Sequence, residues 1–415
     1  MKAYLVGGAV RDALLGRASA DRDWVVVGST PEEMARAGFT PVGRDFPVFL
    51  HPETNEQYAL ARTERKTAPG YRGFAFHAEP TVTLEADLAR RDLTINAMAL
   101  DPQGALIDPF NGKGDLQAHV LRHVSAGFSE DPVRILRLAR FAARFADFTV
   151  AAPTLALARQ MVEAGEVDAL VPERVWQELA RGLMEERPSR MLSVLADCGA
   201  LPRLLPELDR AWRACSPTAG QAKLGGRDHV DHSVDRAARL GADLPTRFAC
   251  LTHDLIDAPA LSAAGAGSSQ GTTAAAGALD RLCERLRVPV DCRDMAHIVI
   301  REYDQVQRCE SLEPEAVLGL LERCDALRRP GRFEGVLLAC ECIASGWPEA
   351  AHRHDPQRLT LSSALQRALG LDSTAVATRA IELGLVGPAI GMAIHAARVC
   401  AIARSSEPGA TAPPD

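Results

Sequence analysis

The spacing of apolar residues changes near residue 125 and divides the chain into two parts. Up to that point, short apolar runs are broken by glycine and proline, as in a region that mixes strands with short helices. After Pro132, apolar residues recur every three or four positions, which predicts an almost entirely helical chain. We expect helices at 132–147, 153–164, 173–186, 188–198, 232–241, 275–286, 314–325, 332–345 and 360–369.

Local signals mark individual elements. Residues 46–51 and 56–62 predict neighbouring strands joined by a turn-rich segment. Thr30-Pro31-Glu32-Glu33 predicts a helix start, because it offers an N-cap hydroxyl, a proline at the first helical position and a glutamate at the third. Residues 63–76 indicate a basic, flexible loop, and residues 258–277, rich in Ala, Ser, Gly and Thr, a flexible insertion.

Composition narrows the class of protein. A chain of 415 residues has room for two to four domains, and 47% hydrophobic with 24% charged residues is ordinary for a soluble protein. No apolar run approaches the roughly 18 residues of a membrane span, and the N-terminus is too short for a signal-peptide core. The ten scattered cysteines indicate free thiols and a cytoplasmic location. A net charge of −7 excludes non-specific nucleic-acid binding by the whole molecule, but not a local basic patch.

The first segment with chemical meaning lies near the N-terminus. The doublet Gly7-Gly8 ends an apolar run and precedes a helical pattern, so a phosphate could approach the backbone and the start of a helix. Asp21 lies 13 residues after Gly8, and Asp23 comes just before a strand-like run that ends at Val27. Side chains two apart on a strand share a face, and two such carboxylates can hold Mg²⁺ against a nucleoside triphosphate. The alternative is a surface Asp-Arg-Asp at a strand edge.

Two further segments carry arginines. In the second, Arg90 and Arg91 adjoin a helix start and could clamp phosphates, while Asp92 could orient an arginine or cap the next helix. In the third, Glu130-Asp131 precedes a helix on which four arginines form one stripe beside an apolar stripe: Arg134, Arg137, Arg140 and Arg144. Taken alone, each segment also fits a solvated helix face with ordinary capping.

Together these segments resemble the class II tRNA nucleotidyltransferases, a family that includes CCA-adding enzymes and bacterial poly(A) polymerases. The pattern is Gly-Gly-x-x-Arg-Asp, Asp-x-Asp, Arg-Arg-Asp-x-x-x-Asn-Ala and Glu-Asp-x-x-Arg. The sequences of residues 61–66 and 171–176 extend the resemblance. The resemblance is densest in the N-terminal half and is closest to bacterial CCA-adding proteins with a C-terminal HD phosphohydrolase domain.

The resemblance implies roles for individual residues. Asp21 and Asp23 correspond to the carboxylates that bind Mg²⁺, and Glu64 is a further candidate acid. The residues that correspond to triphosphate contacts are Gly8, Arg11, Arg91, Arg137 and Arg140. Asp131 and Arg134 match the family's protein template, which reads the Watson–Crick edge of CTP or ATP. A carboxylate can accept from the amino group of C or A, whereas G and U present the wrong pattern.

The second half fits an HD metal set of His232, His253, Asp254 and Asp325, which would hold Ni²⁺ or Mg²⁺. Asp228 and His229 lie close enough to His232 to compete for the place of the first ligand. The family's His-Asp-Leu-Gly-Lys reads here His253-Asp254-Leu255-Ile256-Asp257, and an acid in place of the lysine would repel phosphate. A later expected histidine reads Tyr303. We therefore expect weak or absent phosphohydrolase activity.

The implied fold class is α+β, with a small mixed-sheet nucleotidyltransferase head followed by an all-α neck and body and an all-α HD-type domain. We expect the head at 1–125, the neck and body, which would read the base and bind tRNA, at 126–215, and the degenerate HD domain with its insertion at 216–345. A helical region would follow at 346–404 and a disordered tail at 405–415.

The main hypothesis is an enzyme that adds and repairs the CCA end of tRNA with CTP, ATP and Mg²⁺, without a nucleic-acid template. Candidate tRNA contacts are Arg181, Arg187 and Arg190. A poly(A) polymerase of the same family is less favoured, because those enzymes tend to carry N-terminal and basic C-terminal extensions. An HD phosphohydrolase with a vestigial head and a non-catalytic RNA-binding protein are the alternatives from other classes; intact head motifs argue against both. The sequence leaves open whether the protein is a monomer or a homodimer.

Overall fold

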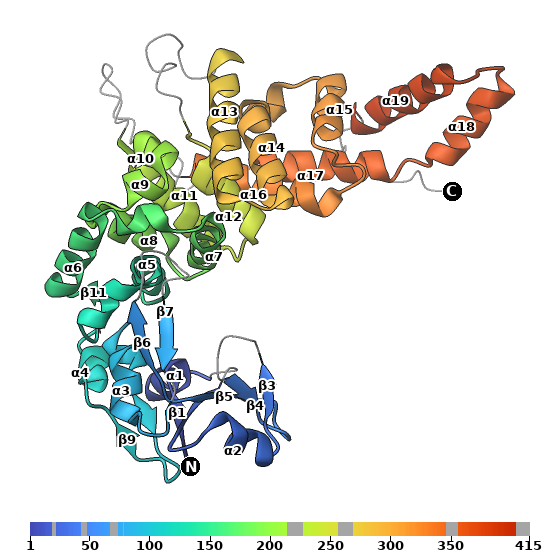
Figure 1. Cartoon of the computed structure of the whole chain (residues 1–415). Helices are drawn as coiled ribbons and strands as arrows, with labels where there is room; N and C mark the ends of the chain where they lie inside the picture. The colour runs from blue at the N-terminus through green and yellow to red at the C-terminus, as the bar shows by residue number, and fades with distance from the viewer. Residues whose placement is uncertain are drawn as a thin grey trace, which may run out of the picture. The chain divides into compact units, whose positions relative to one another are not determined.

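The chain folds into two compact units, residues 1–209 and 210–415. The computed structural model describes residues 1–18, 22–42, 48–66, 74–77, 79–213, 227–255, 269–345 and 356–403. The first unit contains the segments expected as head and as neck and body, and the second begins within helix α10 (Pro206–Arg213). Figure 1 shows the strands gathered at the N-terminal end of the chain and helices throughout the rest.

The head is built on a mixed seven-stranded sheet in the order β3-β4-β5-β2-β1-β8-β9. Within it, β2 and β5 run parallel and the other neighbouring pairs run antiparallel. This confirms the expected mixed sheet, including the pairing of β4 with β5. The strands are β1 Lys2–Val6, β2 Asp23–Val27, β3 Thr40–Val42, β4 Val48–Leu50, β5 Gln57–Leu60, β8 Ala99–Leu100 and β9 Leu106–Ile107.

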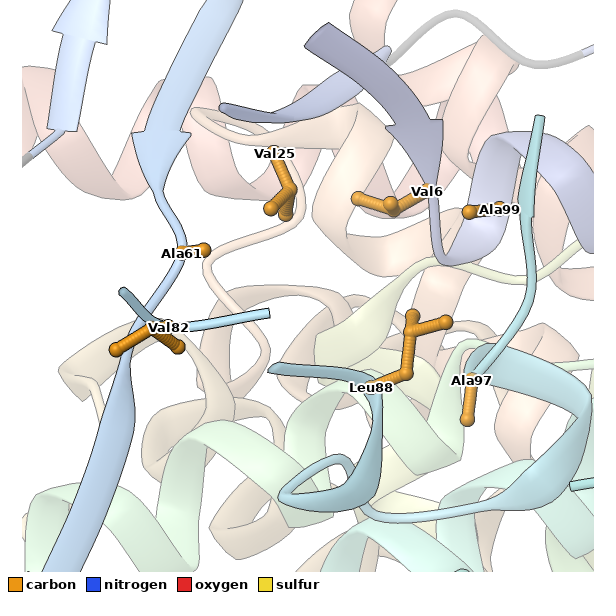
Figure 2. Close-up of a cluster of buried hydrophobic side chains, with 7 residues drawn as sticks. All are labelled: Val6, Val25, Ala61, Val82, Leu88, Ala97 and Ala99. Carbon is orange, nitrogen blue, oxygen red and sulfur yellow. The ribbon is translucent and has the colours of Figure 1, made fainter. Parts of the chain in front are cut away.

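Alternation along the strands distributes apolar residues to both faces of the sheet. Val25 joins a core cluster with Val6 and Leu88, whereas its neighbour Val26 packs on the opposite side with Met34 and Phe39. Figure 2 shows the first cluster, in which Val6, Val25 and Ala99 come from neighbouring strands of the sheet. Burying an aliphatic side chain of this size contributes about 1.5–3 kcal/mol. The sheet is therefore packed on both faces, which holds the residues at the ends of its strands in place.

Short helices and a hairpin complete the head. The predicted helix start at Thr30 is confirmed, because Thr30 Oγ1 accepts from Glu33 N while Glu33 Oε2 accepts from Thr30 N. The expected flexible loop at 63–76 is wrong at both ends, because β6 and β7 pair there as antiparallel strands; residues 67–73 lie outside the described residues. These elements are α1 Gly8–Leu14, α2 Pro31–Arg36, β6 Thr63–Lys66, β7 Phe74–His77, α3 Leu84–Ala89, η1 Thr94–Asn96 and α4 Gly112–Gln117.

Helices form the rest of the first unit, as the spacing of apolar residues predicts. Helix α5 (Val133–Arg144) packs against α7 (Pro172–Leu183) and α8 (Pro188–Asp197), and its predicted apolar stripe of Ile135, Leu138, Ala142 and Phe145 is buried. A small parallel pair of strands, β10 and β11, was not expected. The remaining elements are β10 Val120–Leu121, η2 Ala126–Glu130, β11 Thr149–Val150, α6 Ala152–Glu163, η3 Glu166–Ala169 and α9 Leu201–Leu204.

All regular structure in the described part of the second unit is helical. The expected flexible insertion at 258–277 is wrong from residue 269 onward, because the run of alanines that starts at Ala274 belongs to the first half of α13, and alanine is the strongest helix former. Residues 258–268 and the tail lie outside the described residues. The helices are α11 Arg227–Arg239, α12 Leu244–Thr252, α13 Ser269–Leu286, α14 Val290–Gln307, η5 Cys309–Ser311, α15 Pro314–Arg323, α16 Pro330–Ala344, α17 Pro356–Leu369, α18 Ser373–Glu382 and α19 Pro388–Ala403.

Two general expectations can be compared with the fold. Among the residues that the structure describes, no helix is long and apolar enough to cross a membrane. The nine cysteines in the same described ranges are free thiols, and all but Cys400 are buried.

Candidate active site

The glycine doublet and the second predicted carboxylate meet at one end of the central strands β1 and β2. Strands β1 and β2 run antiparallel with Val6 opposite Asp23, so the chain leaves β1 into Gly7-Gly8 beside the residue that begins β2. Asp23 is exposed at this end of the strands. Asp21 lies outside the described residues, as does the side chain of Glu64, which belongs to β6. Of the two predicted carboxylates, Asp21 and Asp23, the structure describes Asp23 only.

Gly7 allows both the turn into α1 and the close approach of Arg91. Its φ of 72° lies in the left-handed region, and its carbonyl accepts from the Arg11 backbone amide at 3.2 Å at the start of α1. A Cβ at Gly7 would lie 2.9 Å from Nη1 of Arg91, whereas one at Gly8 would be in ordinary contact, 3.5 Å from Arg11 Nη2. Both the turn and the close approach of Arg91 therefore require glycine at position 7.

A continuous chain of hydrogen bonds joins the three arginine-bearing segments. Asn96 Oδ1 accepts from Nη1 of buried Arg11, and Asn96 Nδ2 donates to Asp92 Oδ1 at 3.0 Å. The other oxygen of Asp92 accepts from Arg137 Nε at 2.8 Å and from its Nη2 at 2.7 Å. The expectation that Asp92 orients an arginine is confirmed. We call the chain Arg11–Asn96–Asp92–Arg137 the central relay.

Electrostatics show which groups of the central relay are charged. Burial alone would raise the pKa of Asp92, but Arg137, Asn96 and the Leu93 amide outweigh it and lower this pKa to about 2. In return, the charge of Asp92 raises the pKa of Arg137. Burial lowers the pKa of Arg11, against the charge of Asp12, which accepts from Arg11 Nε at 2.9 Å. The Arg11 guanidinium also lies 5.2 Å from the ring centre of Phe145.

The arginine stripe of α5 makes contacts with four different parts of the first unit. Arg144 Nη2 donates to Asp12 at 3.1 Å, and Arg134 Nη1 donates to the Gly127 carbonyl at 2.7 Å. Arg140 Nε donates to Glu178 on α7 at 2.7 Å, and only 11% of its side chain is exposed. Arg137 is the most accessible of the four, with 37% of its side chain exposed. The predicted triphosphate contact Arg140 is therefore almost enclosed by acids, whereas Arg137 keeps an open side.

The two predicted base-reading residues lie at the start of α5, where the Arg134 backbone amide donates to the Asp131 carbonyl at 3.0 Å. Asp131 Oδ1 accepts from the Val133 amide at 3.0 Å, which caps the helix. Asp131 also accepts from both terminal nitrogens of Arg174 on α7, at 3.0 Å and 3.4 Å. Arg174 had no predicted role, although the sequence of residues 171–176 had been noted as similar to the family's.

Arg91 packs where the predicted triphosphate site would need a cation. Its Nη2 lies 3.3 Å from Asp87 and its Nη1 donates to the Asn96 carbonyl at 3.5 Å. Its Nε is buried with no hydrogen-bond partner among the described residues. Burial would raise the pKa of Asp87, but Arg90 and Arg91 lower it below its usual range. A buried carboxylate thus holds two neighbouring guanidiniums in place.

The second unit contains a separate histidine cluster that does not include His232, the predicted first ligand. The structure brings together His229, His253 and Asp254, whose potential ligand atoms all lie within 4.8 Å of one another. His232 is exposed, and its Nδ1 donates to the Asp228 carbonyl at 2.7 Å. His229 is the buried residue of the two because α11 turns that face toward α12 and α16.

The predicted fourth ligand, Asp325, is also absent from this cluster within the described ranges. It ion-pairs instead with three arginines of the following turn and helix, namely Arg328, Arg329 and Arg332. Tyr303, which stands where a histidine was expected, packs edge-on against the His253 ring with 4.8 Å between ring centres. His229, His253 and Asp254 therefore make a three-residue set.

Hydrogen bonds fix the orientation of this set. His229 Nδ1 lies 2.6 Å from Asp254, while its Nε2 donates to the Ile343 carbonyl at 2.9 Å. A carbonyl on the far nitrogen is the arrangement that orients metal-binding histidines. Burial would lower the pKa of His229, but Asp254 raises it; burial would raise the pKa of Asp254, but His253 and His229 lower it. The donor set of two imidazoles and a carboxylate fits a divalent transition metal.

Comparison with known proteins agrees with this geometry. Family models match residues 3–122 (Poly A polymerase head domain) and 147–211 (Probable RNA and SrmB-binding site of polymerase A). Two proteins named Multifunctional CCA protein are each 56% identical: that of Variovorax paradoxus over 97% of this chain and 99% of its own length, and that of Leptothrix cholodnii over 100% and 99%.

Solved structures share the fold at lower identity. A CCA-adding enzyme in complex with CTP matches with a TM-score of 0.62 at 24% identity, over 98% of this chain and 88% of its own. The Thermotoga maritima CCA-adding enzyme complexed with tRNA matches with a TM-score of 0.60 at 23% identity, over the same shares of each chain. Because close relatives cover the full length of the chain and the head motifs assemble as described, the chain belongs to the family of multifunctional CCA proteins, which are CCA-adding tRNA nucleotidyltransferases.

Proposed function

We propose that this nucleotidyltransferase completes and repairs the 3′ end of tRNA by adding C, C and A from CTP and ATP, with release of pyrophosphate. The observation that carries the proposal is the central relay. It joins residues 11, 96, 92 and 137 next to the end of strands β1 and β2, where Gly7 and Asp23 meet. Relatives that are 56% identical over their full length carry the CCA name, which favours this activity over poly(A) synthesis.

We propose that the triphosphate binds beside Gly7-Gly8, with Arg91 and Arg137 as its main cations. Both side chains are fixed by carboxylates, so little conformational entropy would be lost when a phosphate binds. Arg11 is buried in the central relay, and Arg140 is enclosed by Glu178 and Glu185. Arg11 would therefore act by holding α1 against Asn96 and Phe145, and Arg140 by holding α5 against α7, more than by touching phosphate.

We propose that Asp23, together with Asp21, binds Mg²⁺. An exposed carboxylate at the end of a central strand, beside the proposed phosphate site, suits a hard cation that prefers oxygen ligands. When bound, the metal would lower the charge barrier between the tRNA 3′-hydroxyl and the α-phosphate. The protein's own part is to hold both reactants in line, which the rigid sheet and α5 favour.

Base selection is proposed for Asp131 and Arg134. Asp131 would accept from the amino group that C and A share, and Arg134 would donate to a ring nitrogen or carbonyl. U and G would place an acceptor against the carboxylate and leave it unpaired, which is costly in an enclosed site. In the structure Arg134 is buried and its Nη1 donates to the Gly127 carbonyl, which holds the guanidinium at the start of α5.

The test is incorporation of labelled CTP and ATP onto a tRNA that lacks CCA, with Mg²⁺, by the wild type and by the Asp21→Ala/Asp23→Ala variant. Addition that stops after C, C and A in the wild type, and is lost in the variant, is the expected result. A long A tail would indicate a poly(A) polymerase instead. No incorporation by the wild type would refute the proposal.

A second candidate activity, phosphohydrolysis in the HD remnant, is favoured by one observation: the three-residue set of His229, His253 and Asp254. We propose that these residues, in place of the set that includes His232 and Asp325, hold the divalent cation of the second unit. Because Asp257 replaces the basic residue that would attract phosphate, the expected activity is weak or absent.

A further inference from the structure

We propose that Arg174 is a positioning residue that sets the base selectivity of the enzyme by holding the carboxylate of Asp131 in its reading orientation. This inference rests on the proposed base-reading role of Asp131. It concerns a residue 43 positions further along the chain, on a different helix, to which no role in base selection has been given.

The contact has the geometry of an orienting clamp. Arg174 Nη2 donates to Asp131 Oδ2 at 3.0 Å and Nη1 to Oδ1 at 3.4 Å, while the Val133 amide donates to Oδ1 at 3.0 Å. Each carboxylate oxygen therefore has a partner, and rotation about the last side-chain bond would break these contacts. An ionised carboxylate has about four acceptor sites, so a base amino group can still be received. The side chain of Asp131 is 20% exposed, which leaves it accessible.

Helix α7 is itself fastened to α5 one turn beyond the clamp. Glu178 lies four residues after Arg174 and so falls on the same face of the helix. Its carboxylate accepts from Arg140 at 2.7 Å, and the side chains of both residues are about nine-tenths buried. This second ion pair fixes the distance between the helices at the point from which Arg174 reaches Asp131. Arg174 thus approaches Asp131 from a fixed support.

The chemistry explains why such a clamp would affect selectivity more than turnover. C and U differ at one exocyclic position, where C presents an amino donor and U a carbonyl acceptor. A carboxylate held in place rewards the donor and penalises the acceptor, whereas a carboxylate free to turn away does neither. The planar fork of arginine fixes both oxygens; a lysine would supply charge without fixing the plane.

The experiment measures kcat and KM for CTP, ATP and UTP on tRNA lacking CCA, in the wild type and in Arg174→Met, Arg174→Lys, Asp131→Asn and the Arg174→Met/Asp131→Asn double variant. We expect Arg174→Met to lower the ratio of kcat/KM for CTP to that for UTP by about 10- to 100-fold, since a hydrogen bond to a charged group is at stake. Arg174→Lys should recover part of the ratio. In the Asp131→Asn background, Arg174→Met should change the ratio no further.

The control is Arg203→Met, which removes an exposed Arg–Asp pair that includes neither base-reading residue, with Arg203 Nη1 2.6 Å from Asp168. This variant should keep the wild-type ratio. Equal losses for CTP and UTP in both Arg174 variants would reduce Arg174 to a structural contact and overturn the inference while leaving Asp131 as the reader. If Asp131→Asn itself leaves the ratio unchanged, the base-reading proposal fails, and the inference fails with it.

Discussion

At the scale of single residues, the site depends on positions where the neighbouring atoms restrict which amino acid can function. Gly7 is the clearest case, because the adjacent guanidinium of Arg91 occupies the space that any side chain would need. The central relay is similar: Asn96 accepts from one arginine and donates to the carboxylate that orients another. Neither aspartate nor leucine at position 96 could do both.

We predict that Gly7→Ala abolishes nucleotide incorporation, whereas Gly16→Ala does not. Both glycines have φ near +70°, so both substitutions carry a backbone strain of about 1 kcal/mol. Only at Gly7 would the new methyl group collide with Arg91, since Gly16 has no atom within 4 Å of such a Cβ. Incorporation of labelled CTP, compared at equal fractions of folded protein, measures the difference. Similar activity in both variants would show that the approach of Arg91 to Gly7 is dispensable.

We predict a pH-dependent stability difference between the wild type and Asp92→Asn. The pKa of Asp92 is about 2 in the fold and about 3.9 in an unfolded chain, so its ionised form stabilises the fold above about pH 4 by roughly 2–3 kcal/mol. That contribution is lost as the pH falls from about 4 to about 2. Urea unfolding followed by tryptophan fluorescence should show a gap at pH 7 that narrows below pH 4. A gap that widens on acidification would contradict the central relay.

The sequence predicted single residues well where chemistry alone identifies them and poorly where packing does. Asp92 was expected either to orient an arginine or to cap the next helix, and its contact with Arg137 shows the first role. Asn96 and Arg174 were quoted within motifs but given no role, since their partners lie on other elements that the sequence does not place. His229 and His232 lie three residues apart, and only the packing of α11 shows which of them is buried.

At the scale of elements, α5 and α7 form a pair joined by charges. Arg140 reaches Glu178 at 2.7 Å and Glu185 at 3.5 Å, and Arg174 reaches back to the start of α5. Burial raises the pKa of Glu185 despite the nearby charges of Arg144 and Arg140. The sequence predicted the arginine stripe of α5, but not that Glu178 of α7 and Glu185, two residues beyond its end, would neutralise part of it.

We predict that Glu178→Gln destabilises the first unit by about 3 kcal/mol, because it leaves the nearly buried guanidinium of Arg140 without its main counter-charge. The double variant Arg140→Met/Glu178→Met should recover most of this loss, since two apolar side chains of similar length replace a matched pair. Chemical denaturation measures both. If the recovered double variant also incorporates nucleotides, Arg140 is a structural residue; if it is stable yet inactive, Arg140 contacts phosphate after all.

Several helices were predicted from the spacing of apolar residues, and α14 shows how a polar residue on the buried face can hide one. Helix α14 went unrecognised although Cys292, Met295, Val299 and Val306 are buried at helical spacing. Glu302 takes the remaining position on that face and is 2% exposed, matched by Arg301 at 2.6 Å and Arg323 at 2.8 Å. A glutamate in a core position looks like a solvated residue until its partners, one of them on α15, are known.

At the scale of the whole molecule, the two units carry separate chemistry. The first contains all of the described residues proposed for nucleotide transfer, and the second contains the histidine cluster. The fold class and the order of the helical segments followed from the sequence, because a change from strand-like to helical spacing is visible without tertiary information. The histidine cluster of the second unit could not be predicted in this way, since it depends on how three helical segments pack.

We predict that Ni²⁺ binds to the second unit through His229 and not through His232. Isothermal titration of the full chain with NiCl₂ should show one site that is lost in His229→Gln and in His253→Gln but kept in His232→Gln, because His232 is exposed and turned to its own helix backbone. Glutamine keeps a hydrogen-bonding side chain of similar size at the buried positions, so loss of binding would reflect loss of the ligand nitrogen and not unfolding, which circular dichroism can verify.

Because metal competes with protons for the imidazole nitrogens, binding should weaken on acidification, all the more as Asp254 raises the pKa of His229. Equal loss in His232→Gln would restore the original ligand assignment. Wild-type protein that binds no Ni²⁺ would instead favour a structural role for His229 and Asp254, as a partly buried ion pair that supports the packing of α11 against α12.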